Sequence, residues 1–111
     1  MNIQTNFSLK NYNTFGIEAK ARQFVSVSSI AELKEVLTEN DDIFILVCGS
    51  NMLLTQDIEK LVVHVNLKGR EIVEENDDFA IVKAQAGENW HEFVLWCINQ
   101  NFGGIENLSL I

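Results

Sequence analysis

The sequence predicts an α+β domain with a small mixed sheet, a β–α–β start and packed helices. Three observations predict this class. Residues 23–28 have the composition of a strand, residues 29–40 carry apolar side chains at helical spacing, and residues 43–47 form a short uninterrupted apolar run. Of the 111 residues, 47% are hydrophobic, which is enough to bury a core. One folding unit over residues 1–111 is therefore expected.

The helix predicted over residues 29–40 has a clear start. Ser29 and Glu32 form a capping box, in which the serine oxygen accepts a backbone N–H and the glutamate reaches back to the cap. The run at residues 43–47 has the composition of a strand that is covered on both faces. A strand, a helix and a strand in this order predict a parallel pair joined by a right-handed crossover.

Three further strands are predicted after this unit. Residues 61–67 have strand composition, and residues 70–75 and 79–86 predict a hairpin across the acidic turn 76–78. Because a hairpin would add antiparallel strands to a parallel start, the sheet is expected to be mixed.

A second helix is predicted after residue 89. Asn89 and Glu92 form its cap pair, and Gly103 lies just beyond its expected end. Apolar side chains recur at helical spacing along one face, which predicts that the helix contributes to the core. These side chains are Trp90, Phe93, Val94, Cys97 and Ile98.

The charge balance argues against several classes of partner. The chain carries 16 acidic and 8 basic side chains, for a net charge of -8, and it has no basic cluster. Neither nucleic acid nor an anionic membrane surface is an expected partner. The amino terminus lacks the pattern of a signal peptide, and no window approaches the roughly 18 apolar residues of a spanning helix. A cytoplasmic location is expected.

The cysteines and histidines do not form a metal or disulfide pattern. Cys48 and Cys97 belong to no CxxC pair, which favours reduced thiols, with Cys97 buried and inert and Cys48 the more accessible. His64 and His91 have no second ligand at metal spacing, so structural or solvated roles are expected. The acidic stretch 74–78 lacks the glycine and the glutamate of a calcium loop and is expected to be a solvated hairpin turn.

A Gly-Ser-Asn turn follows the apolar run at residues 43–47. Gly49 and Asn51 accept backbone dihedral angles that most residues avoid, so the turn can direct several N–H groups at one point. Such nests bind phosphates without lysine, which suits a chain with few basic residues. An ordinary turn that ends a strand explains the same tripeptide, and the residues alone leave both interpretations open.

Four stretches together resemble a known family. In chain order they are "SLKNYNTFGIEAKA", "GSNMLLTQD", "AGENWHEFVLWC" and "GGIENLSLI". Their order and spacing closely resemble the UDP-N-acetylenolpyruvoylglucosamine reductase (MurB) family, flavoenzymes of bacterial peptidoglycan precursor synthesis. The resemblance covers nearly the whole chain but only the first part of the family's sequence. There the segment similar to "NLSLI" continues into a Pro-Gly loop with further flavin contacts, so this sequence is expected to stop within the site.

The resemblance implies a fold and a cofactor. The fold would be the FAD-binding fold of the vanillyl-alcohol-oxidase (PCMH) type, in which two α+β subdomains hold FAD between them and a substrate domain follows. Residues 1–111 would form the first, N-terminal subdomain. The cofactor-binding residues implied by position are Val47, Cys48, Gly49, Ser50, Asn51, Met52, Leu53, Asn13, Thr14, Ala86, Gly87 and Ile111.

Within this set, Gly49, Ser50 and Asn51 resemble the family's FAD pyrophosphate loop, and Met52 and Leu53 follow it along the cofactor. One departure concerns the start of the loop. The family usually has glycine where Val47 stands, and often glycine or glutamate where Cys48 stands. A β-branched valine restricts the backbone and narrows the approach to the phosphates.

The other matched segments have structural alternatives. "NTFG", residues 13–16, resembles a motif near the cofactor, and the alternative is a turn held by Asn and Gly before the first strand. "AGENW", residues 86–90, is similar to a segment that closes the flavin site, and a helix amino terminus favours an anion there, although helix capping is an alternative. In "IENL", residues 105–108, Glu106 is expected to be structural.

The resemblance also implies an activity. NADPH would reduce FAD, and the reduced flavin would pass a hydride to the enolpyruvyl double bond of UDP-N-acetylglucosamine enolpyruvate, giving UDP-N-acetylmuramate. The family's catalytic residues would lie after Ile111, so no catalytic residue is named and the chain alone is expected to be inactive, to bind FAD weakly and to self-associate as a homodimer. The alternatives are a stand-alone module that binds a phosphate ligand or a partner, and another flavin oxidoreductase of the same fold.

Overall fold

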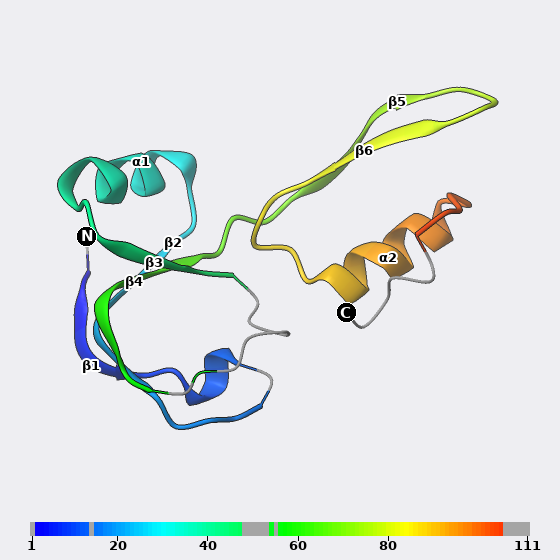
Figure 1. Ribbon diagram of the computed structural model, residues 1–111. Coiled ribbons are helices and arrows are strands. Elements are labelled where there is room, and N and C mark those ends of the chain that lie inside the picture. Colours follow the sequence, from blue (N-terminus) through cyan, green and yellow to red (C-terminus); the bar gives the residue numbers. More distant parts are fainter. Residues whose placement is uncertain (1, 14, 48–53, 55, 106–111) are drawn as a thin grey trace. The chain divides into compact units, whose positions relative to one another are not determined.

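The computed structural model describes residues 2–13, 15–47, 54 and 56–105 (Figure 1). The chain divides into two compact units, Met1–Leu67 and Lys68–Ile111, and each is described by itself. The expectation of one folding unit over residues 1–111 stays a prediction. In the described part of the chain, no helix is long and apolar enough to cross a membrane.

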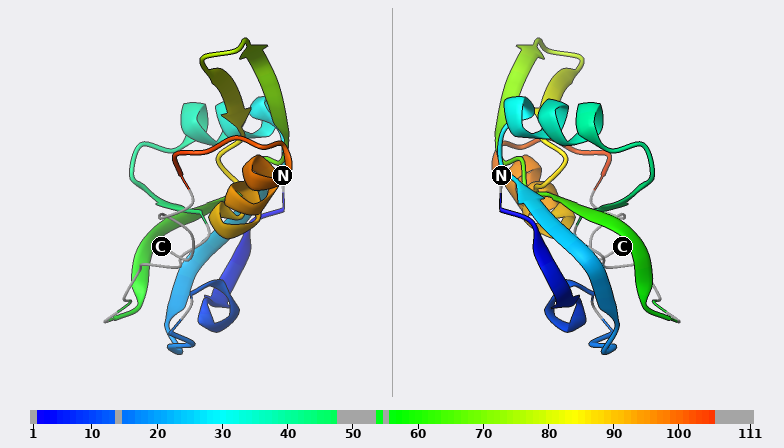
Figure 2. Two further views of the ribbon diagram at one scale, coloured as in Figure 1. Left: turned by 90° about the vertical axis from the view of Figure 1, so that its right-hand side faces the viewer. Right: turned by 90° about the vertical axis from the view of Figure 1, so that its left-hand side faces the viewer.

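The first unit is built on a four-stranded mixed sheet. Its elements are β1 (Gln4–Ser8), a short 3-10 helix (Lys10–Tyr12), β2 (Lys20–Val27), α1 (Ile30–Glu39), β3 (Ile43–Leu46) and β4 (Ile58–Val65). The strand order is β1-β2-β4-β3, with β1 antiparallel to β2 and with β4 parallel to both β2 and β3 (Figure 2). The predicted β–α–β start with parallel strands is confirmed, and β4 lies between the two strands that α1 connects.

The antiparallel pair of the four-stranded sheet does not come from the predicted hairpin. It comes from β1, which lies in the segment before residue 23 where the sequence predicts no strand, and the predicted hairpin forms a separate two-stranded sheet. In β1 only Phe7 is even partly buried, so the strand lacks the alternation that marks a half-buried strand. Its pairing with β2, Phe7 opposite Ala21, holds it in the sheet.

The expectation that residues 43–47 are covered on both faces is wrong. Among the described residues, β3 is an edge strand, with Leu46 fully buried, Ile43 and Phe44 partly buried and Ile45 46% exposed. A continuous apolar run does not distinguish an edge strand from a central one, because the position in the sheet depends on pairing with β4.

Each face of the sheet has its own core, because alternate side chains of a strand point to opposite faces. On one face, α1 lies beside the strands of the sheet (Figure 1). It packs through Val36 and Leu33 against a cluster of strand side chains. The predicted cap is present, since the Ser29 hydroxyl accepts a hydrogen bond from the Glu32 backbone N–H at 3.2 Å. The second cluster comprises Leu9, Ala19, Ala21, Phe24, Leu46, Leu54 and Val62.

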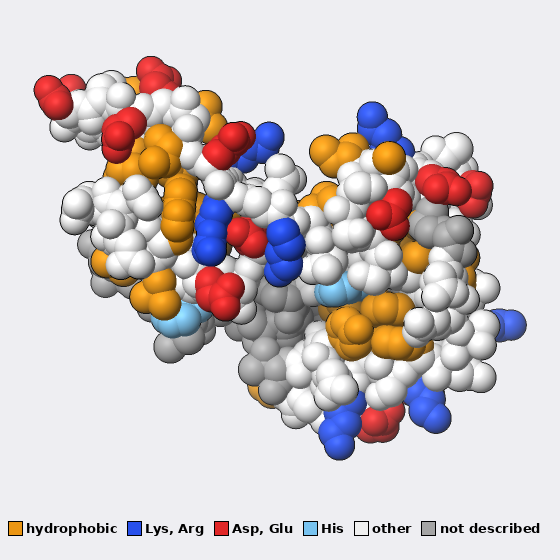
Figure 3. Space-filling view, turned by 180° about the vertical axis from the view of Figure 1, so that it is seen from behind, with side chains coloured by type: hydrophobic (Ala, Val, Ile, Leu, Met, Phe, Trp, Pro, Cys, Tyr) orange, Lys and Arg blue, Asp and Glu red, His pale blue; other side chains and the backbone are white. Residues whose placement is uncertain are grey.

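Aromatic side chains extend this second cluster. The ring of Phe24 stacks on that of Phe7, with 4.0 Å between the ring centroids. The ring centroid of Tyr12 lies 5.2 Å from that of Phe24 and 5.1 Å from that of His64. The His64 Nδ1 lies 2.9 Å from the Ser26 hydroxyl. Figure 3 shows hydrophobic side chains gathered beside a histidine on one face. His64 therefore has a structural place in this cluster.

The second unit contains β5 (Arg70–Glu75), β6 (Ala80–Ala84) and α2 (Trp90–Asn99). The two strands form the predicted hairpin, and α2 buries Phe93, Val94 and Cys97 from its predicted apolar stripe. The helix ends differently from the expectation at Gly103. Asn101 adopts a positive φ of 64°, and the Phe102 N–H bonds the Cys97 carbonyl at 2.9 Å, as in a Schellman motif, where asparagine can replace glycine.

Candidate cofactor site

The parallel strands of the first unit end at a common edge of the sheet. Val27 is paired with Val65, and Leu46 with His64, so β2, β4 and β3 finish side by side. Ligands of open α/β sheets gather at this edge. Val47, which is partly buried, follows β3 there.

The predicted pyrophosphate loop lies outside the described residues. The predicted site residues that lie outside the described residues are Cys48, Gly49, Ser50, Asn51, Met52, Leu53, Thr14 and Ile111. Glu106 lies outside them as well. The cofactor contacts of all these residues stay predictions.

Asn13 holds the turn that leads into β2. Its side-chain amide donates to the Leu9 carbonyl at 2.7 Å and to the Ile17 carbonyl at 3.2 Å, and its Oδ1 accepts from the Ile17 N–H at 3.0 Å. The side chain is buried, and Gly16 has a φ of 63°, which favours glycine. The structural alternative for "NTFG" is therefore present in the fold, and a cofactor contact of Asn13 stays a prediction.

Ala86 and Gly87 occupy a turn at the start of α2. The Glu88 N–H donates to the Gln85 carbonyl at 3.1 Å, which closes the turn, with Ala86 exposed and Gly87 buried. The predicted cap follows directly, because the Asn89 Oδ1 accepts from the Glu92 N–H at 3.0 Å. A helix amino terminus carries a partial positive charge, so this turn is a suitable place for an anionic group.

Two basic residues that the sequence analysis did not single out contact this turn. Lys68 donates from Nζ to the Gly87 carbonyl. The Arg70 Nε lies 3.4 Å from the Glu88 carboxylate, and an Arg70 amino group donates to the Glu92 carbonyl at 3.2 Å. The signal that could have found them is their grouping, since Lys68 and Arg70 are two of only 8 basic residues and lie next to a glycine.

His91, in the first turn of α2, has a polar atom without a partner. Its Nδ1 is buried and has no hydrogen-bond partner among the residues that the structure describes. A buried polar group without a partner costs on the order of 1–3 kcal/mol, so this nitrogen suits a hydrogen-bonding group supplied by a ligand or by another segment. The sequence analysis expected only a structural or solvated role.

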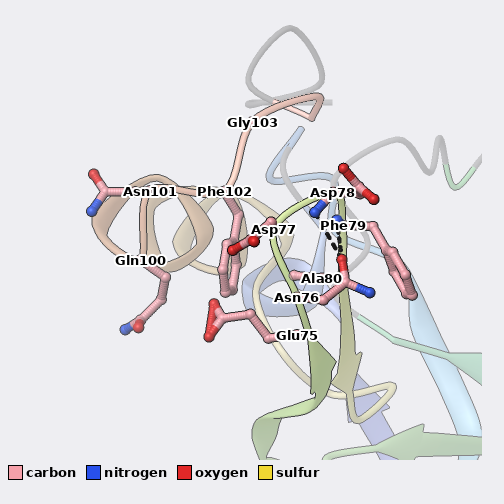
Figure 4. A pocket seen from close by; sticks show the side chains of 10 residues that line it. All are labelled: Glu75, Asn76, Asp77, Asp78, Phe79, Ala80, Gln100, Asn101, Phe102 and Gly103. Carbon is pink, nitrogen blue, oxygen red and sulfur yellow. Dashed lines mark hydrogen bonds between the residues drawn. The ribbon is translucent and has the colours of Figure 1, made fainter.

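A hollow of about 350 Å³ lies between the hairpin tip and the end of α2 (Figure 4). The Asn76 Oδ1 accepts from the N–H groups of Asp78 at 2.8 Å and Phe79 at 2.9 Å, so the acidic stretch forms the predicted turn. Within the described ranges no group of three metal-binding side chains is present. This hollow is lined by Glu75, Asn76, Asp77, Asp78, Phe79, Ala80, Gln100, Asn101, Phe102 and Gly103.

Cys97 is buried in α2, with 2% of its surface exposed. Burial raises the pKa of its thiol above the ordinary value, and the positive charge of Arg70 opposes this shift only in part. Because the thiolate is the reactive form, Cys97 is expected to be unreactive at neutral pH.

In a Cys48→Ser variant, Cys97 is the only remaining thiol, and its reaction with a disulfide reagent can be followed directly. At neutral pH we expect labelling on the order of a hundredfold slower than in denaturant, because the reagent must wait for α2 to open. Since the folded pKa is raised, the neutral thiol favours the fold at low pH, and this contribution is lost as the pH rises through the folded pKa. Rapid labelling of the native chain at neutral pH would contradict the burial of Cys97.

Comparison with known proteins shows what the chain is similar to. No protein-family model matches it. It is 66% identical over 113 residues to the UDP-N-acetylenolpyruvoylglucosamine reductase of Flavobacterium johnsoniae, covering 100% of this chain and 34% of that protein. It is 42% identical over 112 residues to the reductase of the same name from Pseudomonas putida, covering 97% of this chain and 33% of that protein. The chain thus spans about a third of the length of the curated relatives it matches.

The fold agrees with these sequence matches. The crystal structure of UDP-N-acetylenolpyruvylglucosamine reductase (MurB) from Thermus caldophilus matches 96% of this chain and 36% of that chain, with a TM-score of 0.66 and 23% identity. This match confirms the predicted α+β fold of the PCMH type. The sequence matches along the whole chain assign it to the UDP-N-acetylenolpyruvoylglucosamine reductase (MurB) family, and the chain spans about one third of the length of those relatives.

Proposed function

We propose that this chain is the N-terminal FAD-binding part of a UDP-N-acetylmuramate dehydrogenase. The complete enzyme would reduce UDP-N-acetylglucosamine enolpyruvate with NADPH, by way of FAD, in peptidoglycan precursor synthesis. The observation that carries the proposal is the 66% identity, along the whole chain, to a relative named for this reductase activity. A cytoplasmic location and a single subdomain over residues 1–111 are parts of the same proposal.

Two places among the described residues support the proposal of an anionic cofactor. Parallel strands end together beside Val47, and the buried Gly87 precedes the capped start of α2, where His91 offers a buried nitrogen. We assign the FAD pyrophosphate to backbone N–H groups of Gly49, Ser50 and Asn51, because this acidic chain has few cations to offer. The remaining contacts follow the predicted site residues already given.

In such an enzyme the cofactor and the protein have separate roles. FAD, when bound, supplies the hydride transfer, and the protein supplies binding, orientation and electrostatics. The residues of this chain would hold one side of the cofactor and exclude water from it. We assign the proton donor, the NADPH contacts and the substrate contacts to the part of the enzyme outside these residues.

The chain by itself is expected to expose apolar surface and to self-associate. Large hydrophobic side chains of the second unit are 40–58% exposed on β5, the hairpin turn, β6 and α2. Contiguous apolar patches of more than a few hundred Å² commonly mark interaction sites, and a symmetric dimer is the commonest assembly. These side chains are Ile72, Val73, Phe79, Ile81, Leu95 and Ile98.

A binding experiment tests the proposal. The full-length protein should bind FAD, whereas the 111-residue chain should bind it weakly or not detectably. Immobilising the ligand costs about 4–15 kcal/mol in either case, and the 111-residue chain would offset this cost with only half of the contacts. FAD is titrated by flavin fluorescence, and mass is followed by light scattering at several concentrations. A strictly monomeric chain with submicromolar FAD affinity would contradict this two-sided site.

A pair of glycine variants locates the cofactor in the full-length protein. Gly49→Val should abolish FAD binding, because a β-branched side chain restricts the turn and blocks the approach of the phosphates. Gly103→Ala is the matched control, since this exposed glycine lies after α2 and outside the proposed site. Equal FAD affinity of the two variants would refute the assignment of the pyrophosphate to residues 49–51.

A further inference from the structure

We propose that Arg70 and Lys68 are positioning residues for FAD, an inference that rests on the proposed function. They hold the turn at residues 85–88 in a form that presents N–H groups to an anion, and Arg70 neutralises the carboxylate of Glu88. Neither residue needs to contact the cofactor.

The residues at and just before the start of β5 contact the turn at residues 85–88. Three successive residues engage the turn: Lys68 donates to the Gly87 carbonyl, the Gly69 carbonyl accepts from the Gln85 N–H at 2.8 Å, and Arg70 meets Glu88. Gly69 has a φ of 141°, which a side chain would strain. The turn is therefore held from one side along its length.

The direction of these hydrogen bonds has a chemical consequence. Lys68 and Arg70 are donors, and they bind the acceptor groups of the turn and of the first helical turn, namely the carbonyls of Gly87 and Glu92 and the carboxylate of Glu88. Acceptors near an anion repel it, whereas backbone N–H groups attract it. The N–H groups of Gln85 and Glu88 bond carbonyls within the fold. The N–H groups of Ala86 and Gly87 are therefore the ones that we propose for a bound anion.

The charge of Glu88 makes the neutralisation important. Its side chain is only 15% exposed, and it lies in the segment proposed to face the anionic cofactor. In a partly buried site, the repulsion between a carboxylate and a bound anionic group is weakly screened. The Arg70 Nε, at 3.4 Å, balances this charge, and the guanidinium is held further by the Glu92 carbonyl and lies 6.0 Å from the Trp96 ring.

The test is a double-mutant cycle in the full-length protein. Arg70→Met should weaken FAD binding on the order of tenfold, and Glu88→Gln alone should change it little. The double variant should regain most of the affinity, because the repulsive charge is then gone. Lys83→Met is the matched control, since Lys83 is exposed on β6 and lies opposite Glu71 in the register of the hairpin. The FAD affinity of this variant should stay within about twofold of the parent.

A second measurement needs no FAD. In the 111-residue chain, amide hydrogen exchange at residues 86–93 should be faster in Arg70→Met and in Lys68→Met than in the parent or in Lys83→Met. Should Arg70→Met fail to fold, Lys68→Met carries the same test, with faster exchange in the turn and weaker FAD binding.

The outcomes separate the two proposals. If the unmodified full-length protein binds no FAD, the proposed function fails. If it binds FAD and Arg70→Met binds equally well, only the positioning role fails. If Arg70→Met loses affinity that Glu88→Gln does not restore, Arg70 acts on the fold alone and the neutralisation of Glu88 is overturned.

Discussion

The 111-residue chain, supplied with NADPH, FAD and UDP-N-acetylglucosamine enolpyruvate, is expected to oxidise NADPH no faster than free flavin does. The chain spans about a third of its relatives, and under the proposed function it carries one side of the cofactor site and no proton donor. A flavoenzyme needs the cofactor, the substrate and the proton donor in one geometry, so losing most of that arrangement removes the whole rate enhancement.

The measurement is the loss of NADPH absorbance, with and without the enolpyruvyl substrate. The full-length protein serves as the positive control under the same conditions, and its rate should depend on both FAD and substrate. Turnover by the 111-residue chain above the free-flavin background would show that the active site lies within these residues. A full-length protein that binds FAD without this activity would indicate another flavin oxidoreductase.

Asn13→Ala is expected to lower the free energy of unfolding by about 2–4 kcal/mol. The buried side chain makes three hydrogen bonds to the backbone of Leu9 and Ile17. Its loss removes the acceptor of the Ile17 N–H and takes one of two donors from each carbonyl, since the Tyr12 and Ala19 N–H groups still bond them. The measurement is urea denaturation followed by far-ultraviolet circular dichroism.

Asn11→Ala provides the matched control for this variant. Asn11 lies two positions earlier in the 3-10 helix and is exposed, so its loss should change the free energy of unfolding by less than about 0.5 kcal/mol. If Asn13→Ala leaves stability unchanged but weakens FAD binding in the full-length protein, Asn13 acts on the cofactor directly. Closure of the turn would then not explain why an asparagine occupies this position.

Features that depend on neighbouring residues could be predicted from the sequence. The caps of both helices involve side chains three positions from the N–H that they accept, and both form as expected at Ser29 and Asn89. The β5–β6 hairpin likewise depends on a turn between adjacent segments. The resemblance of four short stretches to one family needed no three-dimensional information, since it rests on the order of residues.

Features that depend on pairing between distant segments could not be predicted from the sequence. β1 has no strong pattern and belongs to the sheet because Phe7 pairs with Ala21. In the described part of the chain, β3 is an edge strand because β4 pairs between it and β2. Spacing along the chain does not specify such partners, because any strand with suitable side chains can pair with any other.

The candidate site divides in the same way. By itself, the sequence determined the two helices, the hairpin, the family and the segments proposed to bind FAD, because each signal lies within a few residues. Only the tertiary structure decided that Asn13 closes a turn on Leu9 and Ile17, and that Arg70 reaches Glu88 across the second unit. The physical reason is that these side chains act through partners whose position is set by folding. A carboxylate or carbonyl that contacts a cation only in the folded chain gives no pattern of neighbouring residues in the sequence.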